Sequence, residues 1–274
     1  ERGDSEKQAD KAVTKCVGIL DRPPGGVIVS RLGRGDGGDA VVVWGPFFEA
    51  VAKPVCGGVS SLESAPPLQL CVYPLMRESR SVQIIKYPHP TLRHASKPLR
   101  RVDGELKKMV DRMFELMYEH DGIGLAANQV DLPYRMLVVN VSGDADLKEE
   151  ERVFINPVIT RRKGSEEGRE GCLSFPEVFA PVIRSEKIEL NAFSLQGEEL
   201  TYELDGLYAR AVQHEADHLD GALFIDRMSE ANRLAIRDDL EALEREFETD
   251  RQRGRIADDA EIAARLAELE GART

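Results

Sequence analysis

The most regular hydrophobic pattern of the chain lies in residues 104–120. Apolar residues recur there three and four positions apart, which predicts a helix with one buried face. The residues of that face are Leu106, Met109, Val110, Met113, Phe114 and Met117. We expect the methionines to pack in the core and assign them no cofactor role. Asp121 and Gly122 end the helix, and a loop follows at residues 122–124.

The other patterns before residue 229 are mostly typical of strands. Apolar and β-branched runs predict strands at residues 82–85, 136–141, 153–159 and 187–195, and a helical pattern returns at residues 206–218. Most of these strands follow one another without a helix between them. The sequence therefore predicts an α+β fold, with mainly antiparallel sheets packed around a central helix and with a C-terminal helix.

Residues 229–274 form a charged tail with 13 acidic and 8 basic residues. Its apolar residues stand at helical spacing on both sides of a break near Gly254: Ile236, Leu240, Leu243 and Phe247 before it, and Ile262, Leu266 and Leu269 after it. We interpret the tail as a solvated helical segment that rests one apolar stripe on the body of the protein. The less favoured interpretation is that the tail is a dedicated binding site for a partner.

Composition separates the beginning of the chain from the rest. The first 75 residues hold 11 of the 23 glycines and 7 of the 14 prolines, and none of the five histidines. They show no sustained helical or strand period. We expect residues 1–80 to be an extension that is dispensable for function, poorly ordered or translated from sequence upstream of a natural start at Met76. Residues 81–228 then form the main domain and residues 229–274 the tail.

Overall composition excludes several classes of protein. The 274 residues are 42% hydrophobic and 31% charged, a balance typical of soluble globular proteins, and no apolar run approaches the roughly 20 residues of a membrane-spanning helix. A net charge of −12 disfavours nonspecific binding to nucleic acid. The four cysteines, at positions 16, 56, 71 and 172, are too widely spaced for a disulfide framework, which favours a reducing cytosol.

The strongest chemical signal is QHEADHLDG at residues 213–221. His214 and His218 are four residues apart, so a helix presents them on one face, where they can bind one metal ion. Glu215 adjoins the first histidine and can reach a water bound to that metal. The alternative is a core helix with two histidines in ordinary polar contacts. A metal site needs a third ligand, and no histidine follows His218.

Two further segments contain candidate functional residues, but each is a weak signal when taken alone. Cys172 lies in EGCLSFP at residues 170–176, and a lone cysteine is usually a small buried hydrophobic residue. Residues 122–129 read GIGLAANQ, a run of little side-chain bulk that ends in the amide of Gln129. Such a run can lie against a ligand or simply pack tightly. It is no phosphate-binding loop, because no lysine or arginine follows it.

Together these segments resemble the peptide deformylase family. That family has three blocks in this order: a glycine- and alanine-rich run ending in glutamine, an E-G-C-apolar-S block, and H-E-x-x-H. They stand here at residues 122–129, 170–174 and 214–218, and the run from Tyr87 to Arg93 is similar to the family's opening turn. The resemblance covers roughly residues 82–228, so it leaves out the extension and covers the tail only weakly.

The resemblance implies a set of metal ligands and catalytic groups. Cys172, His214 and His218 would hold one divalent ion, with a water in the fourth position and Glu215 as general base. The side-chain amide of Gln129 and the backbone N–H of Leu173 would donate to the oxyanion. Family resemblance favours Fe(II) as the working metal, with zinc as a poorer substitute, and the ligand set also suits Ni and Co.

The resemblance also implies a substrate and a binding surface. The substrate is the N-formylmethionyl end of a nascent polypeptide, which is cleaved to formate and a free N-terminus. Gly124 would contact it closely through the backbone, and Ile123, Leu125 and Leu207 would be walls for the methionine side chain. Glu170 and Asp217 would hold the loop and the helix in place. We expect a bacterial cytoplasmic enzyme with at most a transient ribosome contact, no membrane association and no specific nucleic-acid binding.

Two other functions stay open on the sequence alone. A general metalloendopeptidase could use the same helix, although the upstream Cys172 and the lack of a downstream histidine disfavour it. A catalytically silent binding module, for instance one docked at the ribosome, is disfavoured by the intact Glu215, Gln129 and three ligands. The tail's net charge of −5 is also a poor match to RNA.

Overall fold

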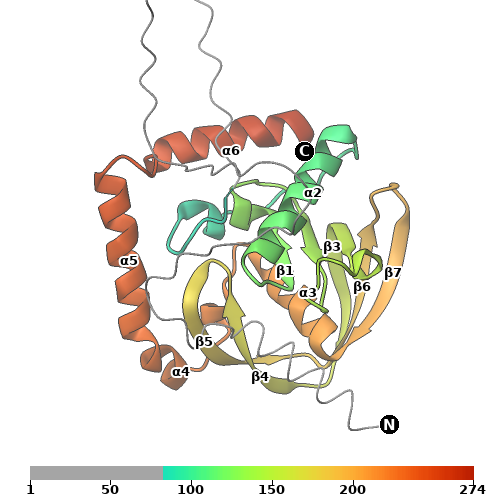
Figure 1. Cartoon of the computed structure of the whole chain (residues 1–274). Coiled ribbons are helices and arrows are strands. Elements are labelled where there is room, and N and C mark those ends of the chain that lie inside the picture. Colours follow the sequence, from blue (N-terminus) through green and yellow to red (C-terminus); the bar gives the residue numbers. More distant parts are fainter. Residues whose placement is uncertain (1–82) are drawn as a thin grey trace, which may run out of the picture. The chain divides into compact units, whose positions relative to one another are not determined.

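The computed structural model describes residues 83–274, so the expected extension at residues 1–80 lies outside the described residues. The described chain has the mixed helical and antiparallel architecture that the sequence predicts (Figure 1). Its main sheet has five strands in the order β1-β2-β3-β6-β7, all antiparallel. These strands are β1 Gly124–Ala126, β2 Met136–Val139, β3 Arg152–Lys163, β6 Lys187–Phe193 and β7 Glu199–Asp205. A separate antiparallel pair consists of β4 Glu166–Cys172 and β5 Phe175–Arg184.

Five α-helices accompany the sheets in the described residues. They are α2 Gly104–Glu119, α3 Gly206–Leu219, α4 Glu230–Ala235, α5 Arg237–Gln252 and α6 Asp259–Arg273. Four single turns of 3-10 helix join them: η1 Pro90–Arg93, η2 Ala127–Val130, η3 Lys148–Glu150 and η4 Phe224–Asp226. Within residues 83–274, none of the helices combines the length and the apolar character needed to cross a membrane.

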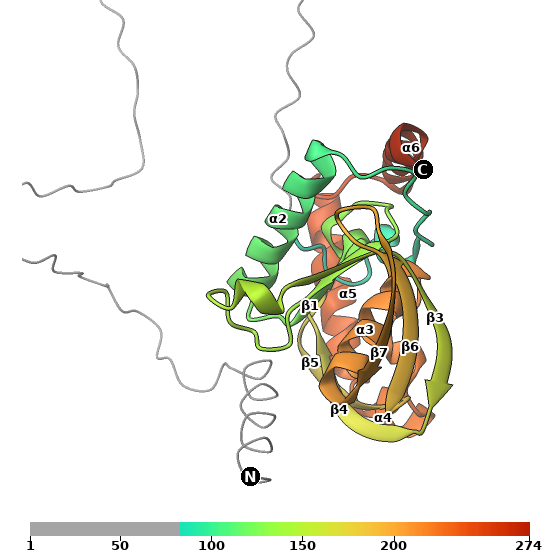
Figure 2. The ribbon, with the colours of Figure 1, turned by 90° about the vertical axis from the view of Figure 1, so that its right-hand side faces the viewer.

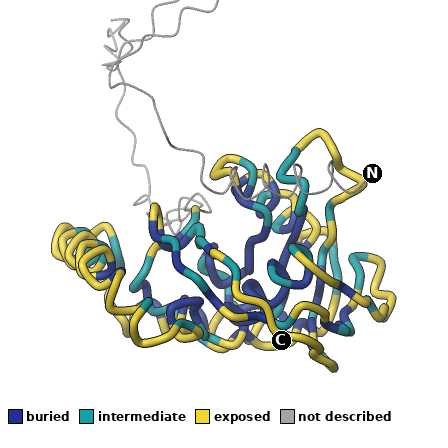
Figure 3. The backbone as a smooth tube through the Cα atoms, turned by 90° about the horizontal axis from the view of Figure 1, so that it is seen from below, coloured by how far each residue is buried: buried dark blue, intermediate teal, exposed yellow. Residues whose placement is uncertain are grey.

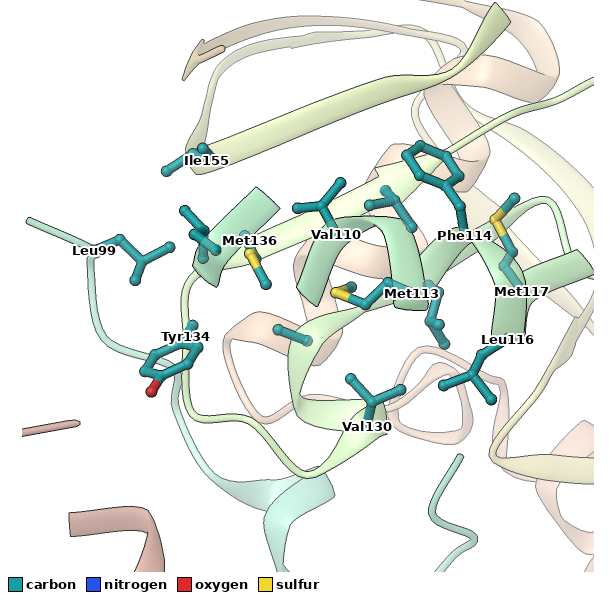
Figure 4. Close-up of a cluster of buried hydrophobic side chains, with 14 residues drawn as sticks. Leu99, Val110, Met113, Phe114, Leu116, Met117, Val130, Tyr134, Met136 and Ile155 are labelled. Atoms are coloured by element: carbon teal, nitrogen blue, oxygen red, sulfur yellow. The ribbon is translucent and has the colours of Figure 1, made fainter. Parts of the chain in front are cut away.

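Helix α2 forms where the hydrophobic spacing predicts it. Its first turn is capped by Asp103, whose Oδ1 accepts the N–H of Leu106 at 2.9 Å. Its apolar face is packed into one core cluster (Figure 4), in which Met113 and Met117 are completely buried. The methionines on this face are therefore core residues, as expected.

The strand β2 lies between two layers of helix. Met136 and Val138 belong to the cluster under α2, whereas Leu137 and Val139 belong to a second cluster that includes α3. Successive side chains of a strand point to opposite faces, so helices on both faces bury every residue of β2. This arrangement places α3 in the interior of the domain, between the sheet and the β4–β5 pair (Figures 1 and 2).

The predicted tail is helical and breaks where the sequence indicated. Helix α5 ends at Gln252 and α6 begins at Asp259. In Figure 1, α5 runs beside the β4–β5 pair, and α6 lies across the end at which α2 begins. Helix α5 is exposed along most of its length (Figure 3) and fully buries only Leu240, in a third core cluster with Phe175 and Phe224. Helix α5 therefore rests on the domain through a narrow stripe.

Some predicted elements differ from the structure. The predicted strand at residues 82–85 is wrong for the described residues 83–85, which form no regular strand. Segment 83–97 instead makes single backbone hydrogen bonds to separate partners: Ile85 N–H to Gln129 O at 2.8 Å, Tyr87 N–H to Ser174 O at 2.9 Å, and Ser96 N–H to Leu219 O at 2.8 Å. A strand would need repeated bonds to one neighbour.

Four strands, β1, β4, β5 and β7, have no counterpart in the sequence prediction, which placed a loop at residues 122–124 where β1 begins. Strand β4 reads EEGREGC and contains too few apolar residues to show a buried alternation. Strand β7 reads ELTYELD and does alternate, with Leu200, Tyr202 and Leu204 at every second position. Strand β5 alternates clearly, with Val178, Ala180 and Val182 all buried, but two prolines interrupt its pattern. The alternation of β5 and β7 could therefore have identified these two strands, whereas the structure of β4 comes from its pairing with β5.

The turn after α3 depends on Gly221. This residue has a φ of +71°, and a Cβ added to it would lie 2.5 Å from the carbonyl oxygen of Arg93. The close approach allows segment 83–97 to pass directly over the end of α3. Gly254 has a similar φ of +69°, yet nothing lies within 4 Å of its Cβ position.

We predict that Gly221→Ala lowers stability more than Gly254→Ala does. Both alanines bear the left-handed strain of roughly 1–2 kcal/mol, and only the first also meets backbone atoms. We expect about 1 kcal/mol lost at Gly254 and about 3 kcal/mol at Gly221 in urea denaturation. Equal losses would show that the contact between α3 and segment 83–97 is easily relaxed.

Candidate metal centre

Three side chains with metal-ligating atoms meet between β4 and α3. The Sγ of Cys172 and one ring nitrogen each of His214 and His218 all lie within 4.8 Å of one another. The Sγ of Cys172 is 3.2 Å from Nε2 of His218, and the two histidine rings have centroids 5.1 Å apart. Both histidines are buried on α3, four residues apart on one face, as the sequence predicted.

A local irregularity of the β4–β5 pair sets the position of Cys172. The register shifts between Gly171, which pairs with Phe179, and Cys172, which pairs with Phe175. Such a bulge redirects a side chain at the end of a strand. Gly171 is needed there because an added Cβ would lie 2.4 Å from the ring of Phe179.

The residues present fit a divalent metal ion. One thiolate and two imidazoles are ligands that zinc and the later first-row metals accept, and three protein ligands leave a position open. Each histidine can present one nitrogen to an ion, since Nδ1 of His214 is engaged by Glu170 at 3.0 Å. A buried carboxylate oxygen beside them, Oε2 of Glu215, lacks a partner among the described residues.

Glu215 lies against the backbone of β1. An added Cβ at Gly124 would be 2.7 Å from Oε1 of Glu215, so only glycine leaves room for this carboxylate. Burial raises the pKa of Glu215 to about 7, against the opposing effect of the nearby His214 and Arg184 charges. A carboxyl group with such a pKa can both accept and return a proton near neutral pH.

The amide of Gln129 has a fixed orientation. Its Oε1 accepts the backbone N–H of Ala126 at 2.8 Å, so its NH₂ group must point the other way. That group lies 3.4 Å from Sγ of Cys172 and 3.3 Å from Oγ of Ser174. The single turn η2 therefore directs the NH₂ group of Gln129 toward Cys172 and Ser174.

Leu173 follows Cys172 directly, so its backbone N–H lies beside a ligand residue. Its side chain packs onto the first block, where an added Cβ at Gly122 would be 2.7 Å from Cδ1 of Leu173. The glycines at 122 and 124 therefore have separate tasks: one admits Leu173 and the other admits Glu215.

The residues expected to contact substrate lie in three different environments. Gly124 faces Glu215, as described above. Ile123 and Leu207 are partly buried, and Ile123 packs against the cluster under α3. Leu125 is completely buried in the cluster under α2, so it would support a pocket from behind without lining it.

A buried ion-pair network holds the histidine helix against β4 and β5. Glu170 accepts two hydrogen bonds from Arg184, each at 2.9 Å, and one from Arg210 at 2.8 Å. Arg184 also pairs with Asp217 on α3, and Arg227 donates to Asp217 at 2.7 and 3.1 Å.

These contacts decide the charge states of the buried carboxylates. Burial alone would raise the pKa of Glu170, but the hydrogen bonds from His214 and Arg184 hold it well below the usual range. The pKa of Asp217 is likewise lowered by Arg227 and Arg184 in spite of burial. Both carboxylates stay ionised and keep their partners oriented, as expected for groups that hold the loop and the helix.

Sequence reasoning missed the arginines of this network. Arg184 is at the inward phase of β5, two residues after the buried Val182, and it is itself only 6% exposed. A charged residue at the buried phase of an alternating strand is the signal that could have identified it, because a buried arginine needs a carboxylate partner. No such signal marks Arg210 in the sequence. Only the fold brings it against Gly168, where an added Cβ would lie 2.7 Å from the guanidinium carbon of Arg210.

Comparison with known proteins finds one family. The sequence profile described as polypeptide deformylase matches residues 81–234. A protein of Rhodopirellula baltica named peptide deformylase is 49% identical over 189 residues, which cover 69% of this chain and 94% of that protein. One of the same name from Neisseria gonorrhoeae is 43% identical over 159 residues, covering 58% of this chain and 93% of that protein.

Solved structures agree with the sequence comparison. A plant peptide deformylase is 41% identical and has a TM-score of 0.60, over 62% of this chain and 93% of that one. A peptide deformylase of Plasmodium falciparum is 38% identical, also with a TM-score of 0.60, over 61% of this chain and 98% of that one.

We predict that Glu170→Gln weakens metal binding. The amide cannot accept from His214 and two arginines together, so the ring of His214 loses its orientation, and such losses typically cost about 10- to 100-fold in metal affinity. The exposed Glu167 lies on the same strand, and Glu167→Gln is the matched control. Metal content measured against a chelator series checks the prediction, and equal affinities for the two variants would contradict it.

Proposed function

This chain belongs to the polypeptide deformylase family, and on that basis we propose how its own residues carry out the family's reaction. Peptide deformylases remove the formyl group from the N-terminal formyl-methionine of nascent polypeptides and release formate. The reaction is the hydrolysis of an amide bond, and the family depends on a metal ion.

We propose that Cys172, His214 and His218 hold that ion and that Fe(II) is the working metal, with zinc, nickel or cobalt able to replace it. Such an ion would act as a Lewis acid and would lower the pKa of water at the site to near neutrality. One thiolate and two neutral imidazoles would leave any of these divalent ions with a net charge near +1.

Glu215 is the proposed general base. Its carboxylate is buried on α3, where Glu215 directly follows His214, and the pKa of about 7 suits a group that must give and take protons at neutral pH. It takes the proton of the attacking water and returns it to the nitrogen of the departing amine. Gly124 keeps the space in which this carboxylate stands.

The developing negative charge on the formyl oxygen needs donors that are already in place. The NH₂ group of Gln129 is oriented by its bond to Ala126, and the backbone N–H of Leu173 lies next to Cys172. Donors fixed before the reaction cost no reorganisation during it. The methionine side chain would then lie along Gly124, Ile123 and Leu207, with Leu125 behind them.

The observation that carries this proposal is the convergence of three segments distant in the chain. Gln129, Cys172 and the histidines of α3 meet at one point, and each is held by contacts that serve no other evident purpose. A general metalloendopeptidase needs only the helix and a third ligand. It gives no reason for a fixed amide donor 3.4 Å from the cysteine ligand.

We further propose that the protein acts in the bacterial cytoplasm, where chains start with formyl-methionine. Its partners are formylated nascent polypeptides, with at most transient contact with the ribosome. The acidic tail supports this restriction, because it complements neither the phosphates of RNA nor an anionic membrane.

We predict rapid release of formate from a formyl-Met-Ala peptide by anaerobic protein loaded with Fe(II), and slower release with zinc. Glu215→Gln should abolish turnover and keep the full metal content, because the amide fits the same space and accepts no proton. Cys172→Ala should lose both. Formate assay and metal analysis check this, and an active Glu215→Gln would exclude Glu215 as the base.

We predict that Gln129→Leu lowers kcat by about 100- to 1000-fold with little change in metal content, as the loss of one oxyanion donor typically does. Ser174→Ala is the matched control, because it removes the other contact of the same NH₂ group and keeps the donor. Steady-state kinetics distinguish the two. An unchanged kcat in Gln129→Leu would remove this residue from the mechanism.

A further inference from the structure

Helix α6 lies outside the residues matched by the family profile, which ends at residue 234. Although it is highly charged, it is firmly attached to the domain (Figures 1 and 2). Ile262 and Leu266 are buried, and so are Glu270 and Arg273, although charged residues are seldom buried without partners. The charged side chains of α6 have partners in residues 83–135, and these partners show which parts of the domain the helix holds.

One attachment is made at the end of η2. Arg265 donates from Nη1 to the carbonyl oxygen of Asp131 at 3.1 Å, and its Nη2 forms an ion pair with the Asp131 carboxylate. The same carboxylate accepts the hydroxyl of Thr91 at 2.6 Å. Asp131 is the left-handed residue that terminates η2, with a φ of +66° and an N–H bonded to the carbonyl of Asn128 at 3.2 Å.

The turn held in this way carries Gln129, two residues before Asp131. A single turn of 3-10 helix has poor hydrogen-bond geometry and little stability of its own, so its position is set by its contacts with other segments. In its middle, the carbonyl of Gln129 accepts the N–H of Ile85 at 2.8 Å, and the side-chain amide of Asn128 donates to the carbonyl of His218. At its start, the contact of Ala126 with Oε1 of Gln129 holds it. At its end, the contacts are those of Asp131 with Thr91 and Arg265.

We infer that α6 positions the oxyanion donor of the active site, with Arg265 acting through Asp131 and η2 on Gln129. The inference rests on the proposed role of Gln129. Arg265 touches neither substrate nor metal ligand and is a positioning residue. A planar guanidinium suits the task, because one of its nitrogens donates to the carbonyl of Asp131 while the other forms an ion pair with the carboxylate of the same residue.

The remaining attachments of α6 provide an internal control. Glu270 binds His94 at 2.7 Å and Lys97 at 2.6 Å, both in segment 83–97. Arg273 donates to both carboxylate oxygens of Asp103 at 2.9 Å and pairs with Glu105, at the beginning of α2. The Arg273 side chain is more buried than that of Arg265, at 5% against 27% exposure, yet it contacts nothing in η2.

The test compares Arg265→Gln with Arg273→Gln in the full-length, metal-loaded protein. We expect Arg265→Gln to lower kcat about 3- to 10-fold with KM and metal content unchanged, since small displacements of a catalytic group are costly. Arg273→Gln should lower the melting temperature at least as much and leave kcat within twofold. Arg265→Lys should recover part of the loss, because it keeps the charge but not the fork.

A double-variant cycle separates positioning from mere stability. If Arg265 acts through Gln129, Arg265→Gln should cost nothing further in a Gln129→Leu background. Asp131→Asn breaks the same ion pair from the other side. Asparagine tolerates the left-handed conformation and keeps an oxygen for the hydroxyl of Thr91. We expect this variant to lower kcat as Arg265→Gln does. Should Arg265→Gln prove unfolded, the Asp131→Asn variant decides the result.

Three outcomes overturn the inference, and they differ in what else they overturn. If Gln129→Leu lowers kcat but Arg265→Gln and Asp131→Asn do not, the positioning role fails while the proposed mechanism stands. If Gln129→Leu leaves kcat unchanged, the donor role fails and the inference fails with it. Equal losses of kcat in Arg265→Gln and Arg273→Gln would assign α6 a role in overall stability alone.

Discussion

The carboxylate of Glu170 is the group on which the site depends. It is buried and ionised, and four nitrogen atoms from three side chains surround it: Nδ1 of His214, two nitrogens of Arg184 and one of Arg210. A buried charge is tolerated only when its partners are complete, because removing one partner leaves the others uncompensated at a cost of several kcal/mol. The orientation of a metal-ligating histidine is therefore coupled to the packing of β4, β5 and α3 as a whole.

Backbone hydrogen bonds from segment 83–97 also connect the parts of the site. Segment 83–97 has no regular secondary structure beyond one helical turn, yet its N–H groups reach Gln129 and Ser174 in the first two blocks and Leu219 directly after the third. Each bond is modest, at about 1 kcal/mol. Together they fix the relative positions of three segments that share no strand pairing with one another.

Much of this arrangement was visible in the sequence, and what was missed has a physical reason. Helices α2 and α3 follow from their spacing, because a helix buried on one face leaves its period in the chain. Strand β4 leaves no such record, since its structure comes from pairing with β5. The ligands and Glu215 could be proposed because the chemistry dictates their residue types. The arginines around Glu170 and the contact of α6 with Asp131 depend on tertiary neighbours, which one sequence does not reveal.

The attachment of α6 has a consequence for how the domain assembles. Arg265 and Asp131 are 134 residues apart in the chain, and His94 and Glu270 are 176 apart. Contacts of such long range are formed late, after the loops between them have been closed, and they slow folding. On the ribosome the chain emerges from its N-terminal side, so residues 83–235 can collapse well before α6 is available. A newly made molecule would thus pass through a period in which its metal ligands have met but the last contact holding η2 has not yet formed.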